Sequence, residues 1–152
     1  MGEGWRRCRT AADFGFWILD WGSPVDEAEF KRRTKQLSIE VIGLARRVER
    51  DIASDAILRQ LIRSASSVGA NYRAACRAKS LPDIISKLSI VEEEADETMF
   101  WLEILAETGT LPRAVVEPLH RETEEILRMT VASIRTLRSR RPNARAEALV
   151  PQ

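Results

Sequence analysis

The chain is poor in the residues that build metal sites and nucleophilic centres. Its 152 residues include two cysteines, Cys8 and Cys76, and a single histidine, His120. The cysteines lack the short spacing of a zinc-binding pair, and His120 has no second histidine or cysteine to complete a site. We therefore predict a protein that is not an enzyme and that uses no metal or cofactor. The low cysteine content also indicates a reducing cytoplasm.

Long apolar runs and glycine-rich loops are missing as well. The longest apolar stretch, residues 14–19, is much too short to cross a bilayer or to form a signal-peptide core. The sequence has no glycine-rich phosphate-binding loop and no Ser/His/Asp set of the kind used by hydrolases. We expect no contact with a membrane. Because these catalytic motifs are absent, the sequence does not predict an enzyme.

The two ends of the chain differ from its middle. Residues 1–25 hold three of the four tryptophans but show no sustained period, so we expect a poorly ordered extension, with an aromatic docking peptide as the alternative. Residues 26–141 are predicted to form the single folded domain. Residues 142–152 are predicted to be a flexible tail.

Apolar residues recur at helical spacing in the middle of the chain. We predict helices over about 26–50, 56–79, 82–108 and 113–140, the last with its regular part starting nearer Pro118. The buried stripe of the first helix is predicted to extend through Val48 to Ile52. Short breaks and matched lengths predict an all-α fold, an antiparallel up-down-up-down four-helix bundle. Its core is predicted to contain Leu58, Leu61, Ala65, Val68, Leu88, Val91, Leu102, Ile126 and Ile134.

The second predicted helix has two different faces. Its apolar side faces the core, and its opposite side carries Arg59, Arg63, Arg73 and Arg77. Residues 56–79 hold five cations and no acid. Gly69 lies at the edge of the core stripe, where a second helix could approach closely. We therefore expect this helix to contact an anionic partner.

The third predicted helix carries the opposite charge. It holds eight acids against one base, and large apolar side chains lie among the acids on its outer side. We predict that this surface meets the arginines of a neighbouring copy in a homo-oligomeric ring. The predicted interface residues are Arg59, Arg63, Arg73, Arg77, Glu93, Glu94, Glu97, Trp101 and Ile104. The alternative is that the arginines pair within one chain or remain solvated.

Basic residues also gather near both ends of the predicted bundle. In an antiparallel bundle the start of the first helix and the end of the fourth share one end, so their charges sum into one patch. A patch of this kind can contact nucleic-acid phosphates, although a solvated helix face is the ordinary use of such runs. The candidate contact residues are Lys31, Arg32, Arg33, Arg138, Arg140 and Arg141.

Three segments carry a resemblance to a known family. Residues 63–73 (RSASSVGANYR), 87–98 (KLSIVEEEADET) and 100–103 (FWLE) are similar, in order and spacing, to the bacterial four-helix bundle proteins related to those encoded within 23S rRNA intervening sequences. The resemblance covers about 30–140. Many members carry a Glu-Gly pair soon after the Asn of the Ala-Asn motif, and here residues 72–76 (YRAAC) stand instead, which resembles one branch of the family.

The resemblance implies a left-handed bundle that assembles as a ring, commonly a homopentamer. It also implies a fold similar to the accessory proteins of diversity-generating retroelements, which work with a reverse transcriptase and its RNA. We therefore expect an oligomeric interaction or scaffold protein, with structured RNA or a nucleic-acid enzyme as candidate partners.

The alternative function is a carboxylate-based, metal-dependent enzyme. Glu92, Asp96 and Glu103 fall on one flank of the third helix, and Asn71 and Ser64 lie on the facing flank of the second. Di-metal centres in bundles usually need a Glu-x-x-His sequence on each of two helices, and this chain has none. Structural ion pairing is the favoured use of these carboxylates.

Overall fold

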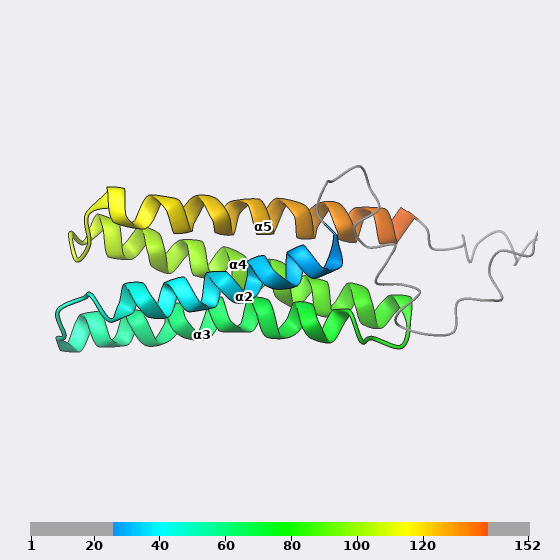
Figure 1. The fold of residues 1–152 in the computed structure, drawn as a ribbon, viewed down its shortest axis with the longest axis horizontal. Helices are drawn as coiled ribbons and strands as arrows, with labels where there is room; N and C mark the ends of the chain where they lie inside the picture. Colours follow the sequence, from blue (N-terminus) through cyan, green and yellow to red (C-terminus); the bar gives the residue numbers. More distant parts are fainter. Residues whose placement is uncertain (1–25, 140–152) are drawn as a thin grey trace, which may run out of the picture.

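The computed structural model describes residues 26–139, and these residues form four helices without any strand. The helices are α2 (Glu27–Ala45), α3 (Ile52–Ala75), α4 (Leu81–Glu107) and α5 (Arg113–Ser139). They run back and forth along one axis, joined by short connections (Figure 1). The all-α bundle predicted from the sequence is therefore confirmed. The predicted N-terminal extension and the predicted tail both lie outside the described residues.

Neighbouring helices pack with unequal closeness. The α3–α4 and α4–α5 pairs are in the most extensive contact, α2–α3 comes next, and α2–α5 touches least. In Figure 1 the chain starts and ends its described part at the same end of the bundle, where α2 begins and α5 finishes. The contact between α2 and α5, called the loose seam below, is thus the least extensive of the four contacts between neighbouring helices.

The boundary between the first two helices differs from the prediction. Helix α2 ends at Ala45, not near Arg50, and α3 starts at Ile52 because Asp51 caps it. The Asp51 carboxylate accepts from the Ser54 backbone N–H at 2.7 Å, and the Ser54 hydroxyl accepts from the Asp51 N–H at 2.9 Å. Ile52 is consequently the first residue of α3 and is 93% exposed, so its predicted place on a buried stripe was wrong.

The later boundaries follow the sequence signals more closely. Ser80 caps α4 as predicted, while α3 ends at Ala75, a few residues before the predicted end near Lys79. Gly109 has a φ of +71°, the left-handed conformation expected after a helix end. Helix α5 runs regularly from Arg113 through Pro118, so the later start that the proline suggested was wrong. Packing of the neighbouring apolar residues against the core holds that first part helical.

The core contains every apolar residue predicted for it. Leu61, Val91 and Ile126 are completely buried, and the other members of the predicted set are 3% exposed or less. The predicted set omitted Leu105 and Val116, which also enter the core on either side of the α4–α5 connection. Leu111 closes this end of the core, and its N–H donates to the Leu105 carbonyl at 3.1 Å.

Helix α2 approaches α3 closely at Gly69, as the sequence predicted. A Cβ atom on Gly69 would lie 3.2 Å from the Thr34 carbonyl oxygen, closer than most side-chain contacts. Nearby, the Ser38 hydroxyl donates to the Ala65 carbonyl of α3 at 3.0 Å. The small residue and the cross-helix hydrogen bond together fix how α2 lies on α3.

Candidate interaction surfaces

Three of the four predicted arginines, Arg59, Arg63 and Arg73, lie exposed on the outer side of α3. Arg77 is also exposed but follows the end of this helix, so it was wrongly placed on it. Arg63 differs from the others because it pairs within the chain, with Glu94 at 3.2 Å and with Glu97 of the adjacent helix α4. No ion pair joins the other three to any residue in 26–139. The alternative considered from the sequence, pairing within one chain, therefore holds for Arg63.

The Arg63 contact also involves the tryptophan of α4. The Trp101 indole N–H donates to Glu97 at 3.0 Å, so one carboxylate accepts from both side chains. These two hydrogen bonds, that of Arg63 first, hold the pKa of Glu97 below its ordinary value. The pKa of Arg63 is raised in turn. This cluster joins α3 to α4 near the middle of both helices.

The outer side of α4 presents a different anchor from the one predicted. Trp101 and Ile104 are only half-buried, and Trp101 packs against the core. Phe100 is 49% exposed and lies edge-on to Trp101, with 4.9 Å between the ring centroids. The sequence placed Phe100 away from the core but did not select it as a site residue. Its exposure, with Glu93 two turns before it on the same side, makes it the stronger candidate for a contact.

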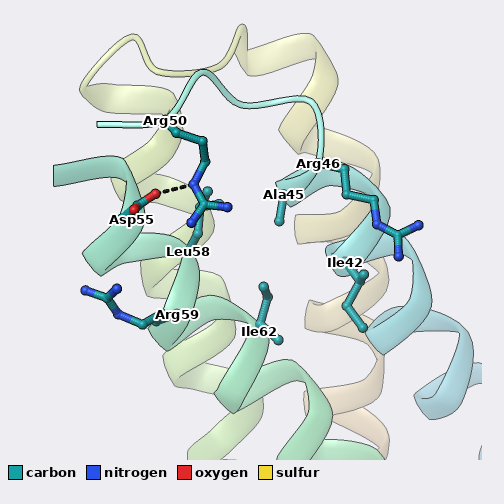
Figure 2. A pocket seen from close by; sticks show the side chains of 8 residues that line it. All are labelled: Ile42, Ala45, Arg46, Arg50, Asp55, Leu58, Arg59 and Ile62. Atoms are coloured by element: carbon teal, nitrogen blue, oxygen red, sulfur yellow. Dashed lines mark hydrogen bonds and ion pairs between the residues drawn. The ribbon is translucent and has the colours of Figure 1, made fainter. Parts of the chain in front are cut away.

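A groove lies on the surface of the bundle between the end of α2 and the start of α3. Its floor is apolar and its rim is basic, as Figure 2 shows. Asp55 on this rim pairs with Arg50. This groove was not predicted from the sequence, because its two walls come from different helices and depend on how α2 packs against α3. The lining residues are Ile42, Ala45, Leu58, Ile62, Arg46, Arg50, Arg59 and Asp55.

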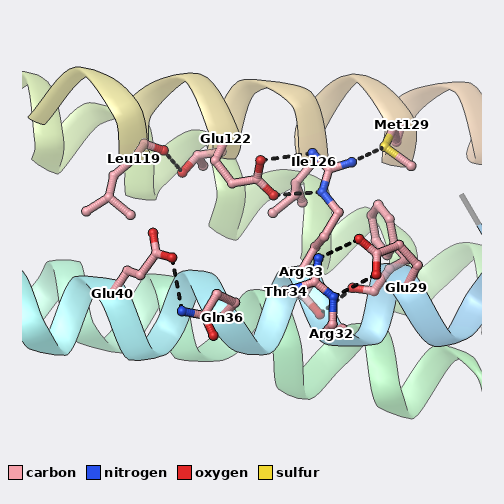
Figure 3. Close-up of polar contacts among 12 residues, drawn as sticks. Glu29, Arg32, Arg33, Thr34, Gln36, Glu40, Leu119, Glu122, Ile126 and Met129 are labelled. Carbon is pink, nitrogen blue, oxygen red and sulfur yellow. Dashed lines mark hydrogen bonds and ion pairs between the residues drawn. The ribbon is translucent and has the colours of Figure 1, made fainter.

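The predicted nucleic-acid patch is largely neutralised by ion pairs. Lys31 pairs with Glu27, and Arg32 pairs with Glu29 at 2.6 Å on the same helix. Arg33 reaches across the loose seam to α5, as Figure 3 shows. These three cations lie together near the start of α2, as expected, but each already has a carboxylate partner.

Arg33 makes the principal polar tie between α2 and α5. Its guanidinium donates to both oxygens of Glu122, at 2.7 and 3.0 Å, and to the Met129 sulfur at 3.4 Å. The Arg33 side chain is only 16% exposed, and its contact with Glu122 raises the pKa of the guanidinium. This residue therefore serves the fold. Arg138 is exposed at the end of α5, and Arg140 and Arg141 lie outside the described residues.

The carboxylates proposed for an alternative metal enzyme are used separately. Glu103 pairs with His120 of α5, with 2.8 Å between the His120 Nε2 and Glu103 Oε1 atoms. Asp96 is exposed and Glu92 half-buried. Within residues 26–139, no three His, Cys, Asp or Glu side chains are grouped so that they could hold a metal ion.

The polar residues expected beside these carboxylates are engaged elsewhere. Ser64 is fully buried and bonds the Thr98 hydroxyl at 3.0 Å between α3 and α4. The Asn71 side chain donates to Ser67 on its own helix. Both residues therefore have structural partners, and the predicted catalytic flank does not come together as one group.

Tyr72 and Cys76 are buried one helical turn apart at the end of α3. The Tyr72 hydroxyl is buried without a hydrogen-bond partner in the part of the chain that the structure describes. Burial raises the pKa of the Cys76 thiol to about 11, and the nearby Glu27 adds to the effect. Cys76 is thus held as a neutral thiol, which is a poor nucleophile.

Comparison with known proteins supports the fold. Residues 26–132 match the family model described as 23S rRNA-intervening sequence protein. A solved structure is similar, that of a protein with unknown function from the S23 ribosomal protein family of Bacteroides thetaiotaomicron, with 30% identity and a TM-score of 0.65. The match covers 70% of this chain and 95% of that chain. No curated protein matches the chain. None of the helices of residues 26–139 is long and apolar enough to span a membrane.

Proposed function

Because the chain belongs to the 23S rRNA-intervening sequence protein family, we propose that it is a non-enzymatic interaction protein that works as a homo-oligomeric ring. The proposal rests chiefly on one observation, the opposite character of two outer surfaces. Arg59 and Arg73 on α3, and Arg77 just after its end, are exposed without ion pairs in the described chain. Phe100 is exposed on α4 beside acidic residues.

Contact between two copies would satisfy both surfaces. Exposed ion pairs contribute only about 0–1 kcal/mol each, so apolar side chains on α4 supply most of the affinity. The charges then decide orientation and partner choice. The contact joins different surfaces of the two copies, so its repetition forms a ring, for which we propose five subunits. We propose a cytoplasmic setting for this assembly, which the low cysteine content supports.

Light scattering after size exclusion tests the assembly. We expect the wild type to have a mass that is a whole-number multiple of 17.2 kDa, with five copies as the proposed number. Ile104→Glu places a charge on the outer side of α4 and should lower this mass toward one chain. Ala132→Glu, an exposed change on α5, is the matched control and should leave the mass unchanged. A wild type that stays monomeric across the concentration range overturns the proposal.

Contact with structured RNA is a second candidate function. It is favoured by exposed Arg138 at the end of α5, where the chain continues with two further arginines. The pairing of Lys31, Arg32 and Arg33 with glutamates leaves this end with less free charge than the sequence suggested. A ring would still repeat the remaining arginines around its axis, where the RNA of a reverse transcriptase or another structured RNA could contact them.

Salt dependence separates RNA contact from simple adsorption. If the end of α5 binds RNA, log affinity should fall linearly with log salt concentration, and Arg138→Gln should reduce the slope by about one phosphate contact. Arg128→Gln, on the outer side of α5 and already paired with Glu124, is the control. Failure of the oligomer to retain a structured RNA at low salt excludes this candidate and leaves the assembly proposal intact.

A further inference from the structure

We infer that the groove between α2 and α3 receives Phe100 of a second copy of this chain, an inference that rests on the proposed homo-oligomer and assigns its two contacting surfaces. The groove is open to solvent, with Ile42 and Ile62 on its floor and arginines on its rim (Figure 2). Its described lining contains no aromatic side chain on which a nucleic-acid base could stack. An apolar floor within a basic rim fits an acidic protein surface with an apolar anchor.

This chain carries such a surface itself. Within residues 26–139, three large apolar side chains are exposed, namely Ile39, Ile52 and Phe100. Ile39 lies one helical turn before Ile42 on α2, and Ile52 lies one turn before Asp55 on α3, so both extend the groove. Phe100 is the exception and stands among the acids of α4. The exposed apolar residues of the described chain are therefore divided between a basic surface and an acidic one.

The two surfaces lie at the same height along the bundle. The hydrogen bond between the Ser64 and Thr98 hydroxyls, 3.0 Å long, marks residues at one level of α3 and α4. These helices run in opposite directions (Figure 1). Phe100, two residues further along α4, is therefore level with Ile62, two residues back along α3. At about 1.5 Å per residue, the anchor and the groove floor are level within one helical turn.

The register of α2 against α3 places the α2 wall of the groove at the same height along the bundle axis. The Ser38 hydroxyl bonds the Ala65 carbonyl, which fixes the register of α2 against α3. Four residues further along α2 is Ile42, and four residues back along α3 is Leu61. Both walls of the groove are therefore at the height of Phe100. Copies joined by this contact need no displacement along the bundle axis, so a rotation alone relates them and the assembly can close into a ring.

The charges around the anchor match those around the groove. Glu107 follows Phe100 by two turns on the same side of α4 and is exposed, without an ion pair in the described chain. By the same register it stands level with Asp55, on the groove rim next to Arg59. Arg46 and Arg59 likewise have no carboxylate within ion-pair distance among the described residues. Seating Phe100 in a neighbouring groove therefore brings Glu107 to within about one helical turn of the height of Arg46 and Arg59, whose guanidinium groups are free in the described chain.

Variants of both surfaces test this contact by light scattering. Phe100→Ala and the double variant Arg46→Glu/Arg59→Glu should each weaken self-association about tenfold or more, since they remove the anchor or reverse the rim charge. Adding Glu107→Arg to the double variant should restore part of the assembly, because the charges are again opposite. Arg135→Glu, an exposed change on α5, is the matched control and should assemble like the wild type. Thermal unfolding of each variant checks that it is folded.

Cross-linking gives a second, independent readout. On a Cys8→Ser background, one chain carries Glu107→Cys and another carries Arg59→Cys, so that both chains keep Phe100 and Ile62. Oxidation should give a covalent dimer from the mixture but not from either chain alone, because the contact joins unlike surfaces. If the wild type assembles while groove and anchor variants assemble equally well and no mixed dimer forms, this inference is wrong and the proposed ring stands. A monomeric wild type instead removes the proposed function as well.

Discussion

Gly43 and Gly69 are both helical glycines, but they meet different surroundings. A Cβ atom on Gly43 would have no heavy atom within 4 Å, whereas one on Gly69 would lie 3.2 Å from the backbone oxygen of Thr34. Glycine is less favourable than alanine inside a helix by about 0.5–1 kcal/mol. The two positions therefore form a matched pair in which only the space available for a methyl group differs.

We expect Gly43→Ala to stabilise the protein by about 0.5–1 kcal/mol through helix propensity. Gly69→Ala gains the same propensity but forces α2 and α3 apart, so it should be less stable than Gly43→Ala by about 1–3 kcal/mol. Urea unfolding at one fixed protein concentration measures both, since assembly also affects stability. Equal stabilisation by the two changes would show that α2 does not depend on close approach at Gly69.

At the scale of elements, the Arg63–Glu97–Trp101 cluster joins α3 to α4 and makes their contact sensitive to acid. The cluster lowers the pKa of Glu97 from its ordinary value of 4.5. On acidification the unfolded chain therefore binds a proton at this residue before the folded chain does. The stabilisation is complete above about pH 4.5 and is lost as the pH falls through the lowered pKa.

We predict that the wild type loses more stability between pH 5 and pH 3 than Glu97→Gln does. Urea unfolding at a series of pH values measures the difference. Glu93→Gln is the control, because Glu93 is exposed on the same helix and has no ion pair in the described chain. Its stability should follow the wild-type pH dependence. Parallel curves for the wild type and Glu97→Gln would show that solvent screens the cluster completely.

Helix boundaries show where sequence periodicity reaches its limit. The core stripes of α3, α4 and α5 followed from spacing, because the period of a helix determines which residues share a face. The end of α2 did not, since Val48 and Ile52 continue the apolar spacing of α2 although the backbone has already left the helix. The competing signal was the capping box of Asp51 and Ser54, which is local and stronger than one more apolar residue in register.

The surfaces were harder to predict than the fold. The sequence identified the arginines of α3 and the acids of α4 as opposite in character, and the structure places both on the outside of the bundle. It could not show that Arg63 is already paired with Glu94 and Glu97, because that depends on how two helices are rotated against each other. The groove was missed for the same reason.

At the scale of the whole molecule, two helix pairs provide most of the cohesion. Helix α4 packs extensively on both α3 and α5, whereas α2 leans mainly on α3. The family match covers this arrangement from residue 26 to residue 132, so it spans all four packed helices. The two surfaces assigned to assembly lie on α4 and on the α2–α3 pair. One contact therefore involves α4, which packs extensively on two helices, and α2, which packs mainly on one.

The loose seam between α2 and α5 gives the molecule a hierarchy of opening. Across it, the Arg33 fork on Glu122 is the main polar link, and few residues of the two helices lie close together. Swinging α2 away requires less free energy than dismantling the layer formed by α3, α4 and α5. We therefore expect α2 to open locally while α3, α4 and α5 stay packed together. In a ring that uses the α2–α3 groove, the neighbouring copy contacts both helices and holds α2 against α3. Assembly would then also protect α2 against local unfolding and proteolysis.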